Sequence, residues 1–295
     1  MSIFTNKKDK PLVDKIVSQM MDSGNARILK LIADIEDIDA KSQKGITLLS
    51  AACITGNLSV ANYIINLGAD VNVKFNGMSN LVLAIIAEQN SKELTELLLK
   101  NNVDPNEKYE GFSPLFIALF AEKDEVVKVL ADYGGDTNYI YNNISPLWHC
   151  YIANKFELAK YLIFKGSDTN YQYNGQSLIW ESIISKKIEF AKFLILKGAD
   201  VNVNYNGSTI LHEAVKLQDQ EMIKLALNAG ADTNATDLSG KTPIELAADI
   251  AFENENNELS INILQLIIDY TDTVSGVSIK ISGETSDLAE TADLY

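Results

Sequence analysis

The sequence predicts an all-α solenoid, in which helix pairs stack on one another and short β-hairpin-like turns join successive pairs. The main observation is a recurring turn, preceded each time by an aromatic residue two places before its glycine or second asparagine. The first gap between these aromatic residues is 34 positions, and the next three are 32. They are Phe75, Tyr109, Tyr141, Tyr173 and Tyr205. A fixed period in this range is typical of stacked repeats that bury their apolar faces against one another.

Each repeat carries signals for two helices and a turn. A Ser or Thr stands two places after the turn, as at Ser113, and its oxygen can cap the first helix. Where Pro follows, as at Pro114, it suits the first helical position, which needs no N–H. The second helix, as in residues 58–67, has apolar residues at helical spacing and ends at a glycine. A D-x-N element such as Asp70-Val71-Asn72 then leads to a dipeptide suited to a tight hairpin, usually Asn-Gly.

The repeats are expected to form one domain over residues 11–270, with about eight helix pairs of which the first and last shield the ends of the stack. A polar insertion at residues 252–258 is expected to be a surface loop. The predicted segments are an N-terminal extension (1–10), an N-terminal cap (11–40), internal repeats (41–240), a C-terminal cap (241–270) and a tail (271–295). The tail is acidic and rich in Ser, Thr and Gly, so we expect a flexible segment rather than a docked one.

Seven turns in register closely resemble the ankyrin repeat. The family pattern is G-x-T-P-L-H-x-A-A near the first helix and L-L-x-x-G-A-D-V-N at the end of the second, and residues 211–214 and 198–202 match it best. The resemblance covers roughly residues 11 to 270 and implies the fold described above. One departure is an inter-helix loop with about two extra residues, near residues 89–93. Another is the family's His position, which is held by Ser50, Val82, Phe116, Trp148, Trp180, His212 and Glu245.

Composition argues against several classes of function. The net charge is −15 and the pI is near 4.6, so the basic footprint of a nucleic-acid-binding protein is missing. No stretch approaches the roughly 18 apolar residues that a membrane span needs, and residues 1–10 show no secretory signal. Two cysteines do not make a disulfide framework, so we expect a reducing compartment, namely the cytoplasm of the protein's own cell or of a host cell.

The histidines do not indicate catalysis. The resemblance implies a structural role for His212, whose side chain would hydrogen-bond to its own turn. His149 is adjacent to Cys150, and neighbours on a helix point to different sides, which does not suit joint metal binding. The sequence contains no C-x-x-C, H-E-x-x-H, P-loop or G-x-S-x-G motif. We therefore predict no enzymatic activity, no catalytic residue, no metal site and no cofactor.

The resemblance also implies a binding surface. In ankyrin-like stacks the hairpin tips and the exposed sides of the first helices form a continuous concave face. At the turns, the implied contact residues are Phe75, Tyr109, Phe112, Tyr141, Ile144, Tyr173 and Tyr205. Near the ends of the first helices they are Ile86, Phe120, Ile152 and Ile184. Rows of rings one repeat apart would leave slots for the apolar side chains of a partner helix or strand.

Two questions stay open at this level. The aromatic rings could instead fold against neighbouring hairpins and seal the stack, and for the isoleucines burial between repeats is the favoured alternative. The expected function is recognition of a cytoplasmic protein, as an inhibitor, an adaptor or a host-directed effector of viral or bacterial origin. The other hypotheses are a structural protein that associates with a second copy of itself, and a small-molecule binder that uses the tyrosine row.

Overall fold

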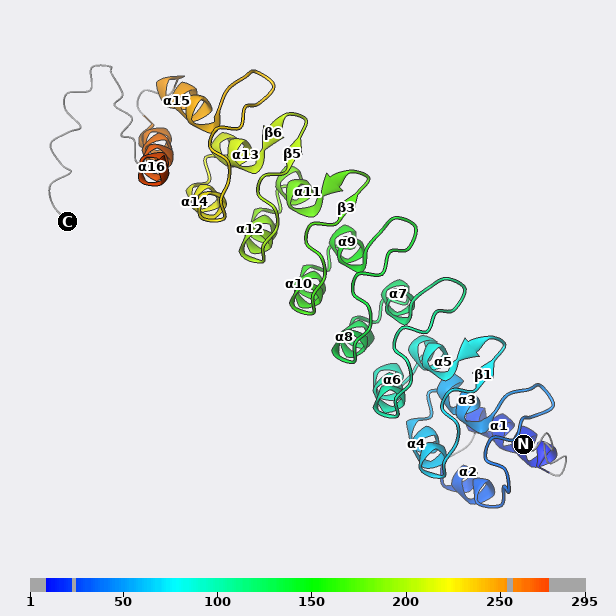
Figure 1. The fold of residues 1–295 in the computed structure, drawn as a ribbon. Helices are drawn as coiled ribbons and strands as arrows, with labels where there is room; N and C mark the ends of the chain where they lie inside the picture. Colours follow the sequence, from blue (N-terminus) through cyan, green and yellow to red (C-terminus); the bar gives the residue numbers. More distant parts are fainter. Residues whose placement is uncertain (1–8, 23–24, 254–256, 276–295) are drawn as a thin grey trace. The chain divides into compact units, whose positions relative to one another are not determined.

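The computed structural model describes residues 9–22, 25–253 and 257–275, and these form helix pairs joined by hairpin turns, as the sequence predicts (Figure 1). The first helices of the pairs are α1 (Lys10–Asp22), α3 (Leu48–Ile54), α5 (Asn80–Ile86), α7 (Pro114–Phe120), α9 (Pro146–Ile152), α11 (Leu178–Ile184), α13 (Ile210–Lys216) and α15 (Pro243–Glu253). The second helices are α2 (Asn25–Ile32), α4 (Leu58–Asn66), α6 (Ser91–Lys100), α8 (Asp124–Asp132), α10 (Phe156–Phe164), α12 (Ile188–Leu196), α14 (Gln220–Asn228) and α16 (Glu258–Ser275).

The chain divides into two compact units, Met1–Asn174 (unit 1) and Gly175–Tyr295 (unit 2). Within unit 1, α3 packs on α5, α5 on α7 and α7 on α9, while α4, α6, α8 and α10 form a second row. In unit 2, α13 packs on α14 and α15, and α15 packs on α16. The hairpins lie beside the first helices and the second helices lie on the opposite side (Figure 1). Each unit has its own apolar core, with fully buried leucines such as Leu81 in unit 1 and Leu211 in unit 2.

The helix starts follow from their capping residues. Ahead of α7, the Ser113 side chain accepts a hydrogen bond from the backbone N–H of Phe116, with Pro114 inside the first turn. This satisfies an N–H group that the helix itself leaves unpaired. The same cap occurs at Thr47, Ser79, Ser145, Ser177 and Thr209.

The hairpins place each aromatic residue opposite the residue three places later. β1 (Lys74–Phe75) pairs with β2 (Met78–Ser79), and β5 (Asn204–Tyr205) pairs with β6 (Ser208–Thr209). Tyr109 and Tyr141 make single bridges to Phe112 and Ile144, and the strands β3 (Gln172–Tyr173) and β4 (Gln176–Ser177) flank the unit boundary. At Asn142 and Asn143 both φ angles are positive, 47° and 66°, as a tight hairpin requires.

Three predicted boundaries differ from the structure. α15 includes Phe252 and Glu253 and α16 begins at Glu258, so the predicted loop at residues 252–258 is shorter at both ends. α16 also continues to Ser275, which makes residues 271–275 helical rather than part of a tail. The helix is held there by burial of Ile267 and Ile268, and the Thr271 hydroxyl donates to their carbonyls. The rest of the predicted tail, residues 276–295, lies outside the described residues.

The insertion in the third pair is split between a loop and a helix. The loop between α5 and α6 has four residues, 87–90, where the loops before α4, α8 and α10 have three. The other additional residue lies in α6, which has 10 residues against 9 in α4, α8 and α10. The sequence placed both extra residues in the loop, because the turn spacing fixes their number but not their position.

Candidate functional site

Hairpin aromatic rings pack on the first helix of the preceding pair. In unit 1, the rings of Tyr173 and Trp148 have centroids 5.3 Å apart, and Tyr141 lies 6.0 Å from Phe116. In unit 2, Tyr205 lies 5.6 Å from Trp180. Phe75, Tyr109, Tyr141, Tyr173 and Tyr205 are all half-buried. The rings of Tyr141, Tyr173 and Tyr205 therefore help to seal the stack, and all five rings still present part of their surface to solvent.

The richest part of this surface is an aromatic cluster in unit 1. Phe112 lies 4.2 Å from Tyr141 and 5.8 Å from Phe120, centroid to centroid. Phe120 lies 6.3 Å from Tyr141 and 5.2 Å from His149. Phe116 is fully buried beneath the cluster. The structure thus brings turn residues and a first-helix end together in one apolar cluster.

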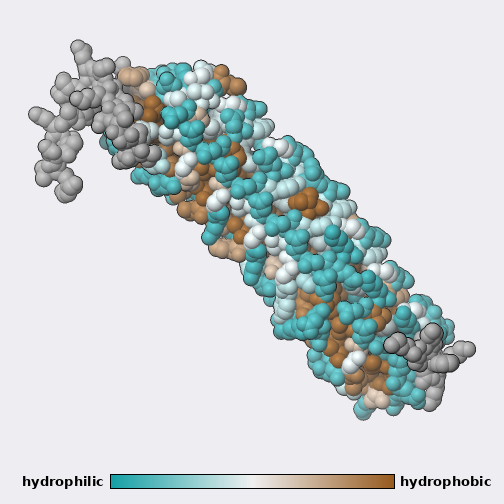
Figure 2. Space-filling view, viewed as in Figure 1, coloured by the Kyte–Doolittle hydropathy of each residue, from teal (hydrophilic) through white to brown (hydrophobic). Residues whose placement is uncertain are grey.

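Residues at the ends of the first helices are exposed, not buried between repeats. The exposed fractions are 47% for Ile86, 49% for Phe120 and 54% for Ile152 in unit 1, and 52% for Ile184 in unit 2. Burial, which the sequence favoured for the isoleucines, is therefore wrong. The core is filled by neighbours on the same helices, such as Ile85 on α5, which leaves the last residue outside. The face seen in Figure 2 is mostly hydrophilic, and hydrophobic residues gather there in patches.

Two tyrosines that the sequence did not single out tie successive hairpins together. The Tyr139 hydroxyl donates to the carbonyl of Gly111 at 2.7 Å, and the Tyr171 hydroxyl donates to that of Asn143 at 2.9 Å. Both donors lie 28 residues after their acceptors, so the bonds join neighbouring hairpin tips. The amine of Lys108 also lies 4.2 Å from the Tyr139 ring centroid, which adds a cation–π contact.

The asparagine side chains of the D-x-N elements connect successive helix pairs by hydrogen bonds. The Asn138 amide donates to the carbonyl of Gly166 at 2.9 Å, and its oxygen accepts the backbone N–H of Asp168 at 2.7 Å. Asn106 and Asn202 make the same two bonds in their own pairs. The sequence showed the repetition of this asparagine but not its role, because its partners lie 28 and 30 residues further on.

The histidines occupy different environments. His212 is buried, its Nδ1 accepts the N–H of Thr209 at 3.3 Å, and its Nε2 donates to the carbonyl of Lys241 at 3.0 Å. This is a structural role, as predicted. His149 is half-exposed at the aromatic cluster, and burial, followed by the charge of Lys155, lowers its pKa. The imidazole is therefore neutral at physiological pH.

Other chemistry in the described residues is limited. Cys53 and Cys150 are unpaired and buried, and burial raises the pKa of each thiol to about 12. Within residues 9–22, 25–253 and 257–275, His, Cys, Asp and Glu residues form no group of three or more that could hold a metal ion. Over the same residues, we find no helix that is both long and apolar enough to cross a membrane.

The fold and this surface define a helical-repeat solenoid with an exposed apolar and aromatic side. The chain belongs to the ankyrin repeat family. The family model for ankyrin repeats, described as three copies, matches residues 16–109, 83–173, 147–237 and 178–274. Ankyrin repeat domains generally mediate protein–protein interactions and are typically non-catalytic.

Solved ankyrin repeat structures are similar to the chain. The ankyrin repeat domain of Bcl-3, a member of the IkappaB protein family, is 22% identical with a TM-score of 0.51. That match covers 76% of this chain and 100% of the Bcl-3 chain, and it supports the fold alone. The human ASB11 ankyrin repeat domain is 21% identical over 75% of this chain and 98% of its own, with a TM-score of 0.44. No curated protein matches the sequence.

Proposed function

We propose that this chain is a non-enzymatic recognition module that binds a protein partner through its hairpin-side surface. In unit 1 this surface comprises Phe75, Tyr109, Phe112, Tyr141, Ile144, Tyr173, Ile86, Phe120 and Ile152. In unit 2, Tyr205 and Ile184 hold the corresponding positions of their repeats. The observation that carries the proposal is the exposure of Phe120, next to the half-buried rings of Phe112 and Tyr141. Large apolar side chains grouped on a surface are the usual anchors of protein interfaces.

Unit 1 supplies most of this surface. Exposed Ile86, Phe120 and Ile152 stand at equivalent positions of three consecutive pairs, so a partner segment can contact several repeats at once. Such a contact is suited to an inhibitor or an adaptor, and these are the roles that we propose. The unpaired Cys53 and Cys150 support a reducing compartment such as the cytoplasm as the place of action.

The test separates recognition from stability by changing exposed residues. A Phe120→Ser/Ile152→Ser double variant removes two exposed apolar side chains, and thermal unfolding shows whether it is still folded, because the Phe120 ring also packs on the buried Phe116 ring, with centroids 5.6 Å apart. The matched control is Leu67→Ser, since Leu67 is 49% exposed in unit 1 but lies at the end of α4, a second helix. Each variant is compared with wild type by thermal unfolding, by quantitative capture from a lysate of the source cells, and by calorimetry on any captured protein.

We expect the control to retain the partner and the double variant to bind it at least about tenfold more weakly, since each lost apolar contact is worth about 1–2 kcal/mol. Equal capture by the folded double variant would overturn the proposed surface. Sedimentation velocity addresses self-association. A concentration-dependent dimer that the double variant abolishes would assign the surface to a second copy of the chain.

A further inference from the structure

The irregular third pair locks two loops of unit 1 together. The α5–α6 loop is one residue longer than its neighbours, and its Asn90 amide donates to the carbonyl of Gly56 in the α3–α4 loop at 2.8 Å. Gln89 approaches so closely that a Cβ on Gly56 would lie 2.5 Å from its carbonyl oxygen. Glu122 and Asn154 hold the equivalent loop positions with positive φ angles of 56°, so the close approach of Gln89, rather than the φ of +69°, is what requires glycine at Gly56.

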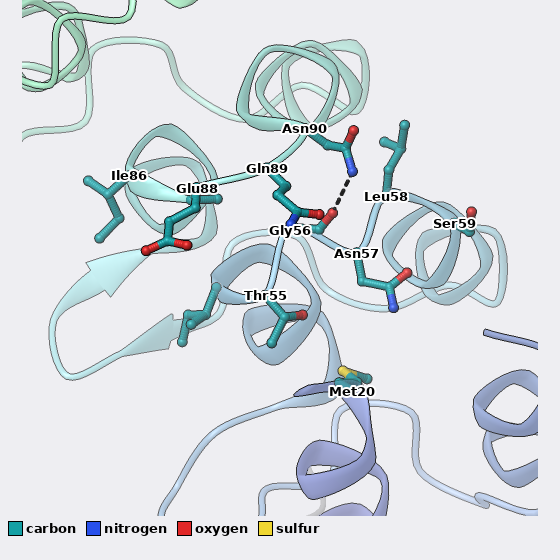
Figure 3. A pocket seen from close by; sticks show the side chains of 12 residues that line it. Met20, Thr55, Gly56, Asn57, Leu58, Ser59, Ile86, Glu88, Gln89 and Asn90 are labelled. Carbon is teal, nitrogen blue, oxygen red and sulfur yellow. Dashed lines mark hydrogen bonds between the residues drawn. The ribbon is translucent and has the colours of Figure 1, made fainter. Parts of the chain in front are cut away.

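An open cavity of about 830 Å³ surrounds this contact. Figure 3 shows Ile86 and Glu88 on one side of it and Leu58 on the other, with Met20 near the α3–α4 loop. Ile54 also lines the cavity, which gives it an apolar component from α1, α3, α4 and α5. Insertions in a repeat array commonly map to loops of its binding face, and here the insertion and the cavity coincide.

The cavity lining carries one charge, and it is negative. Glu88 is the only lining residue with a charged side chain, and it is exposed. The positive charge of Lys123, which does not line the cavity, interacts with Glu88, and its amine donates to the carbonyl of Ala87 and so braces the loop from the next pair. The whole chain carries a net charge of −15, which favours positively charged partners at long range.

We infer that this cavity is an anchor site for a basic protein segment, which places an aliphatic side chain between Ile54 and Ile86 and a Lys or Arg against Glu88. The inference rests on the proposed function, because Ile86 belongs to both surfaces. Beyond the proposed function, the inference specifies that the partner segment is basic and that it binds at one fixed site, the cavity. The hairpin-side surface then contacts the rest of the partner.

A random 12-residue peptide library displayed on phage serves as the probe. The full chain and its Glu88→Lys variant are each used for selection at physiological salt. We expect wild type to enrich peptides with Lys or Arg near Leu, Ile, Val or Met, and the variant to lose that basic enrichment. Recovery of no peptide, or of the same sequences by both proteins, would overturn the inference.

One recovered peptide is then synthesised and measured by fluorescence anisotropy. Glu88→Gln should weaken its binding about two- to fivefold, as expected for one exposed ion pair. The matched control is Glu122→Gln, because Glu122 is likewise an exposed glutamate two residues after the end of a first helix, α7, but does not line the cavity. Ile54→Ala should weaken binding about tenfold. An equal loss in both glutamine variants would show that binding follows net charge and would refute the site.

Two further measurements distinguish a failure of the anchor site from a failure of the proposed function. If Glu88→Gln leaves peptide binding unchanged while capture of the cellular partner still requires Phe120 and Ile152, the anchor site is wrong and the proposed function stands. A dimer in sedimentation velocity that Glu88→Lys dissociates would assign the cavity to a second copy of this chain and would also overturn the inference. Thermal unfolding confirms that each variant is folded.

Discussion

Replacing Asp39 with Asn should stabilise the N-terminal end of the repeats. Asp39 holds the position that Asn138 holds three pairs later, and its carboxylate accepts the backbone N–H of Asp70 at 3.1 and 3.2 Å. A carboxylate cannot donate, so the second bond of the asparagine ladder is missing at this position. By equivalence with the Asn138 amide, an asparagine here would donate to the carbonyl of Gly68.

The expected gain in the free energy of unfolding follows from one added hydrogen bond and one removed charge. A net hydrogen bond contributes about 0.5–1.5 kcal/mol, and at this half-exposed site we expect a gain of about 1 kcal/mol. A gain of this size corresponds to a rise in melting temperature of roughly 2 °C or slightly more. Burial raises the pKa of Asp39, the N–H of Asp70 opposes that rise, and the charges of Asp70 and Asp37 add to it. The ionised carboxylate is therefore less favourable in the folded chain than in the unfolded one.

The pH dependence provides a second check. Because the pKa of Asp39 is higher in the folded state, the folded wild type binds more protons than the unfolded chain as the pH falls through this pKa. Wild-type stability therefore recovers on acidification, and the advantage of Asp39→Asn should be largest at neutral pH and shrink toward about pH 4. Urea unfolding followed by circular dichroism measures the gain, and hydrogen exchange at the amide of Asp70 localises it.

The reverse change, Asn138→Asp, should remove one donor and add a charge, and so lower stability. An Asp39→Asn variant that is no more stable than wild type at pH 7 would refute the ladder argument. A gain that does not change with pH would refute the part that rests on charge.

Three other outcomes are expected. Trp148→Phe should destabilise the chain by about 1 kcal/mol more than Trp180→Phe in urea unfolding. The reason is that the indole N–H of Trp148 donates to a backbone carbonyl, whereas that of Trp180 is buried without a partner among the described residues. Equal losses of stability in the two variants would contradict this. Burial lowers the pKa of His149 in the folded chain, so the contribution of His149 to stability is present above the unfolded-state pKa of about 6.5 and is lost as the pH falls. From pH 7.5 to 5.5, wild type should therefore lose stability that the His149→Gln variant retains. Parallel curves of stability against pH for the two proteins would contradict this. Cys53 and Cys150 should react with a thiol reagent only as fast as the chain opens, and rapid labelling of the folded protein would show that they are accessible.

Much of the fold is readable from the sequence because each repeat is specified by local signals. The Ser113 cap, the Pro that follows it and the left-handed glycine at Gly166 each act within one turn of helix. Their recurrence at a fixed period then identifies the stack. The end of α16 is not readable in this way, because its last turn is polar and is supported by Tyr270, whose hydroxyl donates to the distant carbonyl of Leu227.

Only part of the candidate surface could be predicted from the sequence. The sequence indicated which residues stand at the turns and at the first-helix ends, but not how far each is buried, since this depends on packing between pairs. Ile152 illustrates the point: an isoleucine in an apolar helix looks like a core residue, yet it is more than half exposed. The cavity near Glu88 was missed, although the irregular 34-residue spacing was a signal for it.

The tyrosine row is best explained by stacking, with recognition built on top of it. At the family's His position, His212 donates to the carbonyl of Lys241 in the next hairpin, and Trp148 reproduces that bond with its indole N–H on the carbonyl of Tyr171 at 3.0 Å. Where the family's His position holds Trp148 or Trp180, a tyrosine of the next hairpin packs on the indole ring. Where it holds His212, the equivalent residue of the next hairpin is Leu238, which is 84% exposed. Removing a tyrosine therefore weakens the stack and the surface together, whereas the exposed isoleucines at the first-helix ends, Ile86 and Ile152, report more directly on recognition.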